Sequence, residues 1–318
     1  GEDIHNGAVG GIISGTIFLA EAMASLGCYV EVYNKIQDEK SFNGVSYKRF
    51  RYGIKIKADL IVANNTASVF RDCEGHCVVW QRNRASISRL FKRKEVFQLL
   101  RKRPALVSLS HDALRNTPKY LPYCKRYVIP HAVEDCFLNV AEKNRPPAGR
   151  KVFFASRASR NLDVAIRVWE RFVFPIVPDA EFFVCGTGPE LSEESIAKFE
   201  SLNIRYLGGI SKVELAKLMS ESRLLFYPGH EAETGCQVAL QAVASGVPIV
   251  TMGIGSLKDW VVDGRTGYLV SSEEEYGDKV VELLVNDDKW LDFHRFSLSS
   301  PWVKDYTQGA REWLSIIE

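Results

Sequence analysis

The chain has 318 residues, with 41 Lys and Arg against 39 Asp and Glu, and a net charge of +2. This length suffices for two domains of ordinary size. A hydrophobic share of 46% with 25% charged residues is typical of a globular protein. The longest apolar runs have the length of strands, so the sequence indicates neither a transmembrane helix nor a cleavable signal peptide.

Seven cysteines, an odd number, are scattered along the chain, and most lie beside apolar strand residues. This pattern favours reduced thiols in an intracellular, cytoplasmic protein. The segment from Cys73 to Cys77, with Glu74 and His76 between them, invites comparison with a zinc site. Because no second ligand pair has suitable spacing, we expect buried thiols there rather than zinc.

The positive charge is concentrated in residues 82–103, which hold nine Lys and Arg against one Glu, a net +8. Since the total is +2, the rest of the chain carries −6. Apolar residues between the charges favour either a solvated amphipathic helix or an electropositive face toward an anionic membrane or a phosphate-bearing acceptor. A nucleic-acid partner is disfavoured because no recognised binding module accompanies the charge.

Strand-like and helix-like segments alternate along the first part of the chain. A Gly-rich start passes into a helix that ends at Leu26, and strands are expected over 28–33, 58–64, 77–80 and 105–110. Polar residues follow two of these strands: Asn64, Asn65, Gln81 and Arg82. Ligands of open α/β sheets bind beyond the carboxyl ends of strands, so these four are expected in the binding crevice. Residues 139–150 are polar and contain Pro and Gly, which predicts a linker.

The alternation restarts after residue 150. Strands are expected over 152–155, 180–185, 204–210, 224–227 and 248–251, and helices over 234–244, 276–285 and 308–317. Arg157 and Arg160 follow the first of these strands and open a helix, an arrangement suited to binding an anion. The helix that begins near Thr234 likewise offers an anion-binding N-terminus, with Glu233 before it.

The stretch 228–250 resembles the donor-site segment of retaining, nucleotide-sugar-dependent glycosyltransferases with the GT-B fold, the large family 4 group. Glu233 matches the first Glu of that family's Glu-x7-Glu pattern, and Gly246-Val247-Pro248 matches the helix end. The second acid of the pattern is replaced by Gln241. The segment 127–134 resembles the family's Ile-Pro-Asn-Gly-Val-Asp segment, with His131 and Ala132 in place of Asn and Gly.

The resemblance implies an α/β protein with two Rossmann-like, doubly wound parallel-sheet domains that face a central cleft. The acceptor-side domain is expected over residues 1–138, completed by a C-terminal helix at about 301–318 that crosses back onto it. The linker 139–150 is followed by a nucleotide-sugar-binding domain over 151–300.

The resemblance also implies site residues. Glu233 and Arg160 are the expected catalytic pair. Donor binding is expected at Gly10, Gly11, Arg157, Arg160, Gly186, Gly209, Ile210, Glu233, Thr234, Gly235, Cys236, Gln237 and Gln241. An acid at position 241 would accept hydrogen bonds from both ribose hydroxyls, whereas Gln241 loses the charge-assisted part, on the order of 1 kcal/mol per bond. We therefore expect weaker donor binding, with the chemistry retained.

The implied reaction moves a sugar from a UDP-sugar or GDP-sugar to a glycan, a lipid-linked acceptor or a glycoprotein, with retention of configuration. Arg160 and the helix N-terminus would stabilise the departing diphosphate without a metal or other cofactor. The alternative is a degenerate GT-B protein that binds a nucleotide sugar or a partner without catalysis. Gln241 and the absence of a crevice His near Gln81 and Arg82 motivate that alternative.

Overall fold

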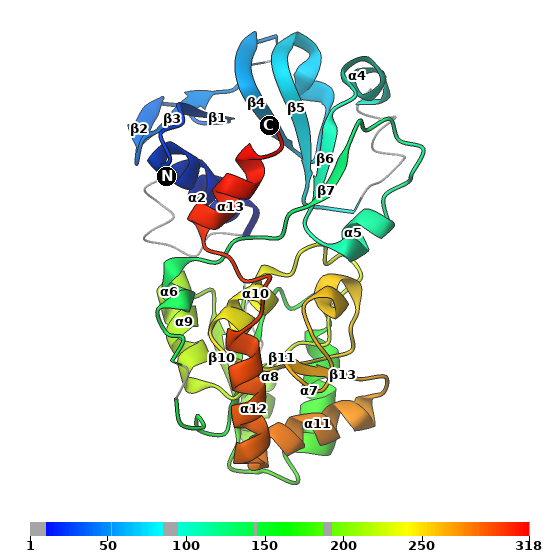
Figure 1. Ribbon diagram of the computed structural model, residues 1–318. Coiled ribbons are helices and arrows are strands. Elements are labelled where there is room, and N and C mark those ends of the chain that lie inside the picture. The colour runs from blue at the N-terminus through cyan, green and yellow to red at the C-terminus, as the bar shows by residue number, and fades with distance from the viewer. Residues whose placement is uncertain (1–10, 52, 85–94, 143–144, 187–192, 318) are drawn as a thin grey trace. The chain divides into compact units, whose positions relative to one another are not determined.

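The computed structural model describes residues 11–51, 53–84, 95–142, 145–186 and 193–317. Within these ranges the chain forms two compact units. The first holds the described residues up to Ala132 and from Lys304 onward, and the second runs from Val133 to Val303. Each unit is an α/β structure built on parallel strands, as the sequence predicts (Figure 1).

The second unit contains a six-stranded sheet in the order β10-β9-β8-β11-β12-β13. All five strand pairs are parallel. The strands are β8 (Lys151–Ala155), β9 (Glu181–Cys185), β10 (Ile204–Gly208), β11 (Leu224–Phe226), β12 (Ile249–Thr251) and β13 (Gly267–Leu269). The chain builds the sheet outward from β8 in one direction and then from β11 in the other. The crevice beside β8 and β11 is therefore the topological switch point, where open α/β sheets bind ligands.

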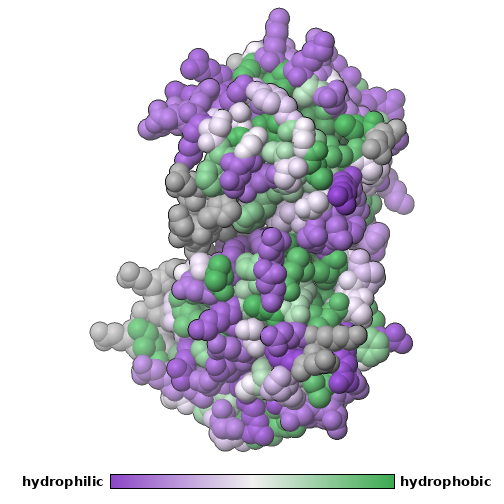
Figure 2. Space-filling view, turned by 60° about the vertical axis from the view of Figure 1, so that its left-hand side comes forward, coloured by the Kyte–Doolittle hydropathy of each residue, from purple (hydrophilic) through white to green (hydrophobic). Residues whose placement is uncertain are grey.

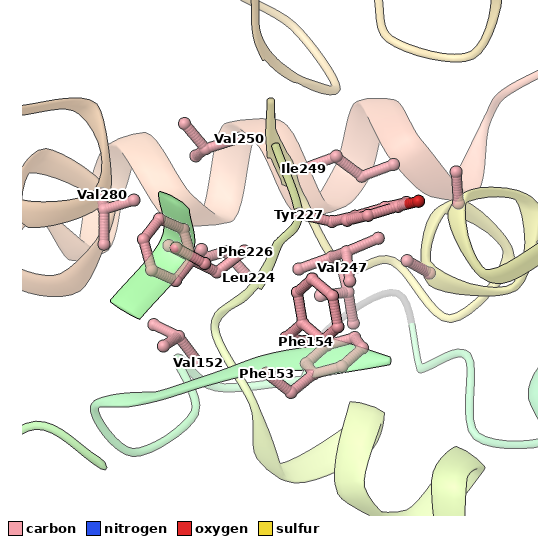
Figure 3. Packing of buried hydrophobic residues seen from close by; sticks show 14 of the residues in the cluster. Val152, Phe153, Phe154, Leu224, Phe226, Tyr227, Val247, Ile249, Val250 and Val280 are labelled. Carbon is pink, nitrogen blue, oxygen red and sulfur yellow. The ribbon is translucent and has the colours of Figure 1, made fainter. Parts of the chain in front are cut away.

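Helices cover both faces of this sheet (Figure 1). They are α6 (Asp135–Leu138), α7 (Leu162–Val168) with the π-helical turn η2 (Trp169–Val173), α8 (Glu193–Ser201), α9 (Lys212–Glu221), α10 (Gln237–Ala244), the 3-10 helix η3 (Gly255–Asp259), α11 (Glu273–Val285) and α12 (Asp287–Leu298). Strands covered on both faces are nearly all apolar. Accordingly, Phe154, Phe226 and Tyr227 are fully buried among the side chains of Figure 3. The rings of Phe154 and Tyr227 meet edge to face, with centroids 5.3 Å apart.

The first unit contains a four-stranded parallel sheet and a separate three-stranded sheet. The four strands are β4 (Ile56–Asn64), β5 (Cys73–Gln81), β6 (Ala105–Ser108) and β7 (Arg126–Val128), and the three are β1 (Val30–Asn34), β3 (Val45–Arg49) and β2 (Lys40–Phe42). The four-stranded sheet is parallel, as expected for this unit, and the separate three-stranded sheet is an addition that the sequence analysis did not predict. The hairpin of β2 and β3 turns at Asn43 and Gly44, both with positive φ (48° and 76°), the Asn-Gly signal of a tight hairpin.

The helical elements of the first unit are α2 (Gly11–Ser25), the 3-10 helix η1 (Ser68–Asp72), α4 (Glu95–Lys102), α5 (His111–Arg115) and α13 (Tyr306–Leu314). The C-terminal helix α13 packs beside α2 (Figure 1). Trp313 lies edge-on to Trp80 of β5, with ring centroids 4.9 Å apart. The C-terminal segment thus belongs to the first unit from Lys304 onward.

The boundary between the units lies between Ala132 and Val133, earlier than the expected residue 138. Val133 and Phe137 are fully buried in the core of the second unit. The expected linker 139–150 is fastened to the same unit: His294 Nε2 lies 2.8 Å from the carbonyl oxygen of Glu142, and Arg223 Nε donates to that of Ala148 across 2.8 Å. Backbone carbonyls of this segment therefore find their hydrogen-bond partners within the second unit.

Hydrophilic side chains cover much of the visible face of each unit, with apolar residues scattered among them (Figure 2). None of the helices in the described ranges is both long and apolar enough to cross a membrane.

Candidate active site

The loop after β11 carries Glu233 and has little conformational freedom. The backbone N–H of Glu233 donates to the carbonyl of His230 across 2.9 Å, and its own carbonyl accepts from Ser256 N at 3.2 Å. Gly255 has a φ of +72°, and a Cβ there would lie 2.5 Å from the carbonyl oxygen of His230. Only glycine accommodates both the left-handed conformation and the close approach. The backbone on both sides of Glu233 is therefore fixed before any ligand binds.

The carboxylate of Glu233 is held at both oxygens. Its Oε1 accepts a hydrogen bond from Nη1 of Arg160 in an ion pair, and its Oε2 accepts from the hydroxyl of Tyr227 at 3.0 Å. Glu233 is only 8% exposed, so this pair lies in a largely desolvated environment. The structure thus brings together Arg160 and Glu233, the two residues of the predicted catalytic pair.

The electrostatics of this network favour the charged pair. Burial by itself would lower the pKa of Arg160, but the charge and hydrogen bond of Glu233 more than offset it, so the pKa is raised. Burial, followed by the negative charge of Glu233, raises the pKa of Tyr227 well above its usual range. Tyr227 therefore stays a neutral hydrogen-bond donor, and Arg160 a cation. Tyr227 was not among the predicted site residues, because an aromatic residue at the end of an apolar strand is typical of the hydrophobic core.

Arg160 reaches Glu233 from the loop after β8. Its neighbour Asn161 has a φ of +63°, a left-handed conformation that Asn tolerates better than most residues. Nδ2 of Asn161 donates to the carbonyl of Gly229 across 2.6 Å. The loops after β8 and β11 are thereby joined at the switch point. Arg157, the second candidate in this loop, has an exposed side chain, so the geometry selects Arg160 as the partner of Glu233.

The first turn of α10 follows directly from Glu233, through Thr234, Gly235 and Cys236. Cys236 precedes the helix with φ 41° and ψ 67°. Burial raises the pKa of its thiol well above the usual value, so the sulfur is uncharged. The leading N–H groups of a helix and its dipole favour an anion at this end. The site therefore presents two sources of positive potential, Arg160 and the start of α10.

Gln241 and Gln237 both bind a residue that the sequence analysis did not select. Nε2 of Gln241 donates to Oε2 of Glu134 across 2.7 Å, and Nε2 of Gln237 donates to Oε1 across 3.0 Å. Nζ of Lys212 lies 3.4 Å from the same Oε1. The glutamines are 107 and 103 positions away from Glu134, so no local spacing could have revealed the cluster.

The remaining candidates of the second unit follow the ends of β9 and β10. Gly186 has a φ of +147°, and a Cβ there would lie 1.9 Å from the carbonyl oxygen of Ser156, so this glycine allows two strand ends to approach. Gly209 is exposed and Ile210 half-buried after β10. All of them lie at the carboxyl edge of the sheet, on the side of Arg160 and Glu233. The expected turn after Gly186 falls on residues 187–192, outside the described ranges.

The candidates of the first unit centre on Arg82. Its Nη2 donates to the carbonyl of Gly11 at 3.2 Å, and its Nη1 to Thr16 Oγ1 at 2.8 Å. The guanidinium lies 3.8 Å over the ring of Trp80, and burial lowers the pKa of Arg82 to about 10. A Cβ at Gly15 would be 2.5 Å from Nη2, so this glycine makes room for the cation. Arg82 thus anchors the start of α2; Gly10 lies outside the described residues.

Two other polar side chains near the end of β5, Gln81 and Asn65, form hydrogen bonds within the first unit. Gln81 is buried, and its Oε1 accepts from Ser108 Oγ and Thr117 Oγ1, each at 2.9 Å. Oδ1 of Asn65 accepts from the backbone N–H of Arg82 at 2.7 Å. Both side chains secure the loops after β4 and β5, which fits a structural role better than the expected ligand contact.

The sulfur atoms of the Cys73–Cys77 segment donate to backbone carbonyls. Cys73 Sγ donates to Val69 and Cys77 Sγ to Gly75, and burial raises the pKa of Cys77 to about 11. Across the described part of the chain, no group of three His, Cys, Asp or Glu residues could hold a metal ion. Cys73 and Cys77 are therefore buried thiols that donate to backbone carbonyls.

The fold agrees with the comparisons to known proteins. Residues 138–295 match the family described as Glycosyl transferases group 1. Anabaena HepE, solved in complex with UDP and glucose, superimposes with a TM-score of 0.72 at 14% identity, covering 98% of this chain and 97% of that protein. WaaG, a glycosyltransferase involved in lipopolysaccharide biosynthesis, gives a TM-score of 0.68 at 14% identity, covering 97% and 96%. The chain has the GT-B fold of these glycosyltransferases.

The residues that match the group 1 family lie within the second unit, Val133–Val303. The phosphatidyl-myo-inositol mannosyltransferase of Mycobacterium leprae is 28% identical over 151 residues, which cover 45% of this chain and 39% of the relative. The matches to the first curated relatives span only 24%, 19% and 20% of those proteins' lengths.

Proposed function

We propose that this protein is a retaining glycosyltransferase that moves a sugar from a UDP-sugar or GDP-sugar to a glycan, glycolipid or glycoprotein acceptor. The observation that carries the proposal is the Arg160–Glu233 pair at the switch point of a group 1 domain, beside the start of α10. The likeness to a protein solved with UDP and glucose supports the donor class.

In this role the charges have separate tasks. Departure of a nucleoside diphosphate leaves negative charge on the diphosphate, which Arg160 and the N-terminus of α10 stabilise without a metal. The carboxylate of Glu233 accepts hydrogen bonds from sugar hydroxyls and stabilises the positive charge that develops at the reacting carbon. Each of its oxygens has a second lone pair for this purpose beyond the bonds to Arg160 and Tyr227.

The test is release of nucleoside diphosphate from a panel of UDP- and GDP-sugars, with EDTA present throughout. Glu233→Ala should abolish turnover while nucleotide binding is largely kept. Glu231→Ala, which removes an exposed acid from the same loop, is the matched control. Full activity in Glu233→Ala would show that the catalytic assignment is wrong. Nucleotide binding without turnover in the unmodified protein would favour the non-catalytic alternative, and a requirement for added metal would overturn metal independence.

A peripheral contact with an anionic membrane is part of the proposal, because lipid-linked acceptors lie at such surfaces. Phe97 and Leu100 of α4 are 65% and 61% exposed and lie three residues apart, on one face of the helix. Basic residues end the segment at 101–103, and Nζ of Lys102 also donates to the carbonyl of Cys73. Exposed apolar side chains beside Lys and Arg are the pattern of an interfacial helix.

A further inference from the structure

The proposed reaction assigns no role to the cluster of polar side chains around Glu134. Glu134 is 5% exposed and lies directly before α6. Two amide groups from one face of α10 and the ammonium group of Lys212 in α9 converge on its carboxylate. Such a set of charge-assisted hydrogen bonds is stronger and more directional than neutral ones. The cluster therefore fixes side chains at the start of α10.

The carboxylate dictates how both amides are turned. An ionised carboxylate only accepts hydrogen bonds, so Gln237 and Gln241 must each present their NH2 group to it and direct their carbonyl oxygen elsewhere. Gln241 is 1% exposed and lies in the core. Gln237 is half-buried in the first turn of α10, next to the expected diphosphate position. The oxygen of Gln237 is therefore the acceptor that the cluster leaves available near the expected diphosphate position.

That oxygen has no hydrogen-bond donor among the residues that the structure describes. Oε1 of Gln237 is buried and accepts no hydrogen bond from any of the described residues. Buried polar atoms are nearly always hydrogen-bonded, so a bound ligand is a suitable source of the missing donor. Among the parts of a nucleoside diphosphate, the ribose hydroxyls are O–H donors attached close to the phosphates. Small side-chain shifts at the first turn of α10, common when ligands bind, would admit one of them.

We infer that Glu134 is a positioning residue for donor recognition: it turns Gln237 so that Oε1 accepts a hydrogen bond from a ribose hydroxyl. Gln241 contributes by holding Glu134, without touching the donor. This inference rests on the proposed function and revises the expected direct contact of Gln241. The pattern of the family has a carboxylate at position 241. In this chain the carboxylate of the cluster comes instead from Glu134, which precedes α6.

The test compares calorimetric dissociation constants of UDP and GDP with those of their 2′-deoxy and 3′-deoxy forms, on the full chain. The unmodified protein should bind the ribonucleotide roughly threefold to tenfold more tightly than one of its deoxy forms, the value of one hydrogen bond. Gln237→Met, which keeps the side-chain length but removes the acceptor, should bring that ratio close to one. Glu134→Gln should do the same, because an amide at position 134 no longer dictates how Gln237 is turned. Glu221→Gln, at an acid paired with Lys151 elsewhere in the unit, should keep the full ratio.

The outcomes distinguish a failure of this inference from a failure of the proposed function. Nucleotide binding with no preference for ribose, or a full preference retained in Gln237→Met or Glu134→Gln, overturns the inference and leaves the proposed function standing. Absence of any nucleoside diphosphate binding overturns both. Thermal melting of each variant reports folding. If Glu134→Gln does not fold, Gln237→Met decides the inference by itself.

Discussion

The hydroxyl of Tyr227 donates to Glu233 across 3.0 Å, from a ring that is completely buried in the core of the second unit. The expected catalytic acid is thus bonded to a side chain in the buried core of its domain. Under the proposed function Arg160 turns toward a diphosphate, and the bond from Tyr227 then still holds the carboxylate. This gives an otherwise apolar core residue a role at the site.

Removal of that hydroxyl should reduce catalysis. Tyr227→Phe loses one hydrogen bond to a charged group, worth ~1.5–3 kcal/mol, so we expect turnover to fall about tenfold or more, with little change in nucleotide affinity. Steady-state kinetics and calorimetry measure the two effects. Tyr276→Phe is the matched control, because Tyr276 lies in the same core and its hydroxyl has no hydrogen-bond partner among the described residues. Equal losses in both variants would show that Tyr227 acts through packing alone.

Arg160 should matter more than Arg157 for donor binding. Arg160→Ala removes the cation beside Glu233, and we expect UDP or GDP to bind at least tenfold more weakly, about 1.4 kcal/mol. Arg157→Ala should weaken binding less, because that side chain is exposed. Arg171→Ala, an exposed arginine after α7, serves as the control for the lost charge. Calorimetric titration decides the order, and a larger effect at Arg157 would reverse the assignment.

Gly255 should tolerate no side chain. Gly255→Ala places a Cβ 2.5 Å from His230 O and 2.9 Å from Glu233 O, and such overpacking costs ~1–3 kcal/mol beyond the backbone strain. Gly264 has the same φ of +72° but nothing within 4 Å of the added atom. Gly264→Ala should therefore cost only the strain, ~1–2 kcal/mol. Melting curves and turnover of the two variants distinguish the cost of the left-handed backbone from the cost of the steric clash. Equal destabilisation of both variants would contradict the close approach at Gly255.

Stability should fall at alkaline pH partly through Cys185. Burial raises the pKa of its thiol from 9.0 to about 12, so the unfolded chain loses this proton before the folded chain does. The preference for the neutral thiol stabilises the fold fully below pH 9.0 and is lost as the pH rises toward 12. Cys185→Ala should show a shallower fall of the urea midpoint over this range. Cys124→Ala, at an exposed cysteine, should follow the unmodified protein.

The exposed face of α4 should contribute to vesicle binding. Phe97→Ser with Leu100→Ser should reduce co-sedimentation with anionic vesicles severalfold, because the apolar anchors are lost. Ile176→Ser is the control, since Ile176 is 61% exposed on the second unit, as Leu100 is on α4. Binding of the unmodified protein should weaken as salt is added. Equal binding to neutral and anionic vesicles, independent of salt, would remove the electrostatic contribution from the proposal.

Local patterns in the sequence determined most of the second unit. Near-continuous apolar runs predicted its strands, and glycines and helix-forming segments between them predicted parallel crossovers, because these signals act within a few residues. The same reasoning placed Arg160 and Glu233 at strand ends. In the first unit the hairpin of β2 and β3 and the separate small sheet were not predicted, although Asn43-Gly44 is a hairpin turn signal.

Tertiary structure decided which of these residues meet. Arg160 and Glu233 are 73 positions apart, and Glu134 lies more than 100 positions from both glutamines that bind it. A sequence pattern records neighbours along the chain, whereas contacts between strand ends depend on the order of strands in the sheet. For the same reason only the fold showed that Tyr227 bonds to Glu233, that Gln81 and Arg82 secure their own unit, and that the second unit begins at Val133.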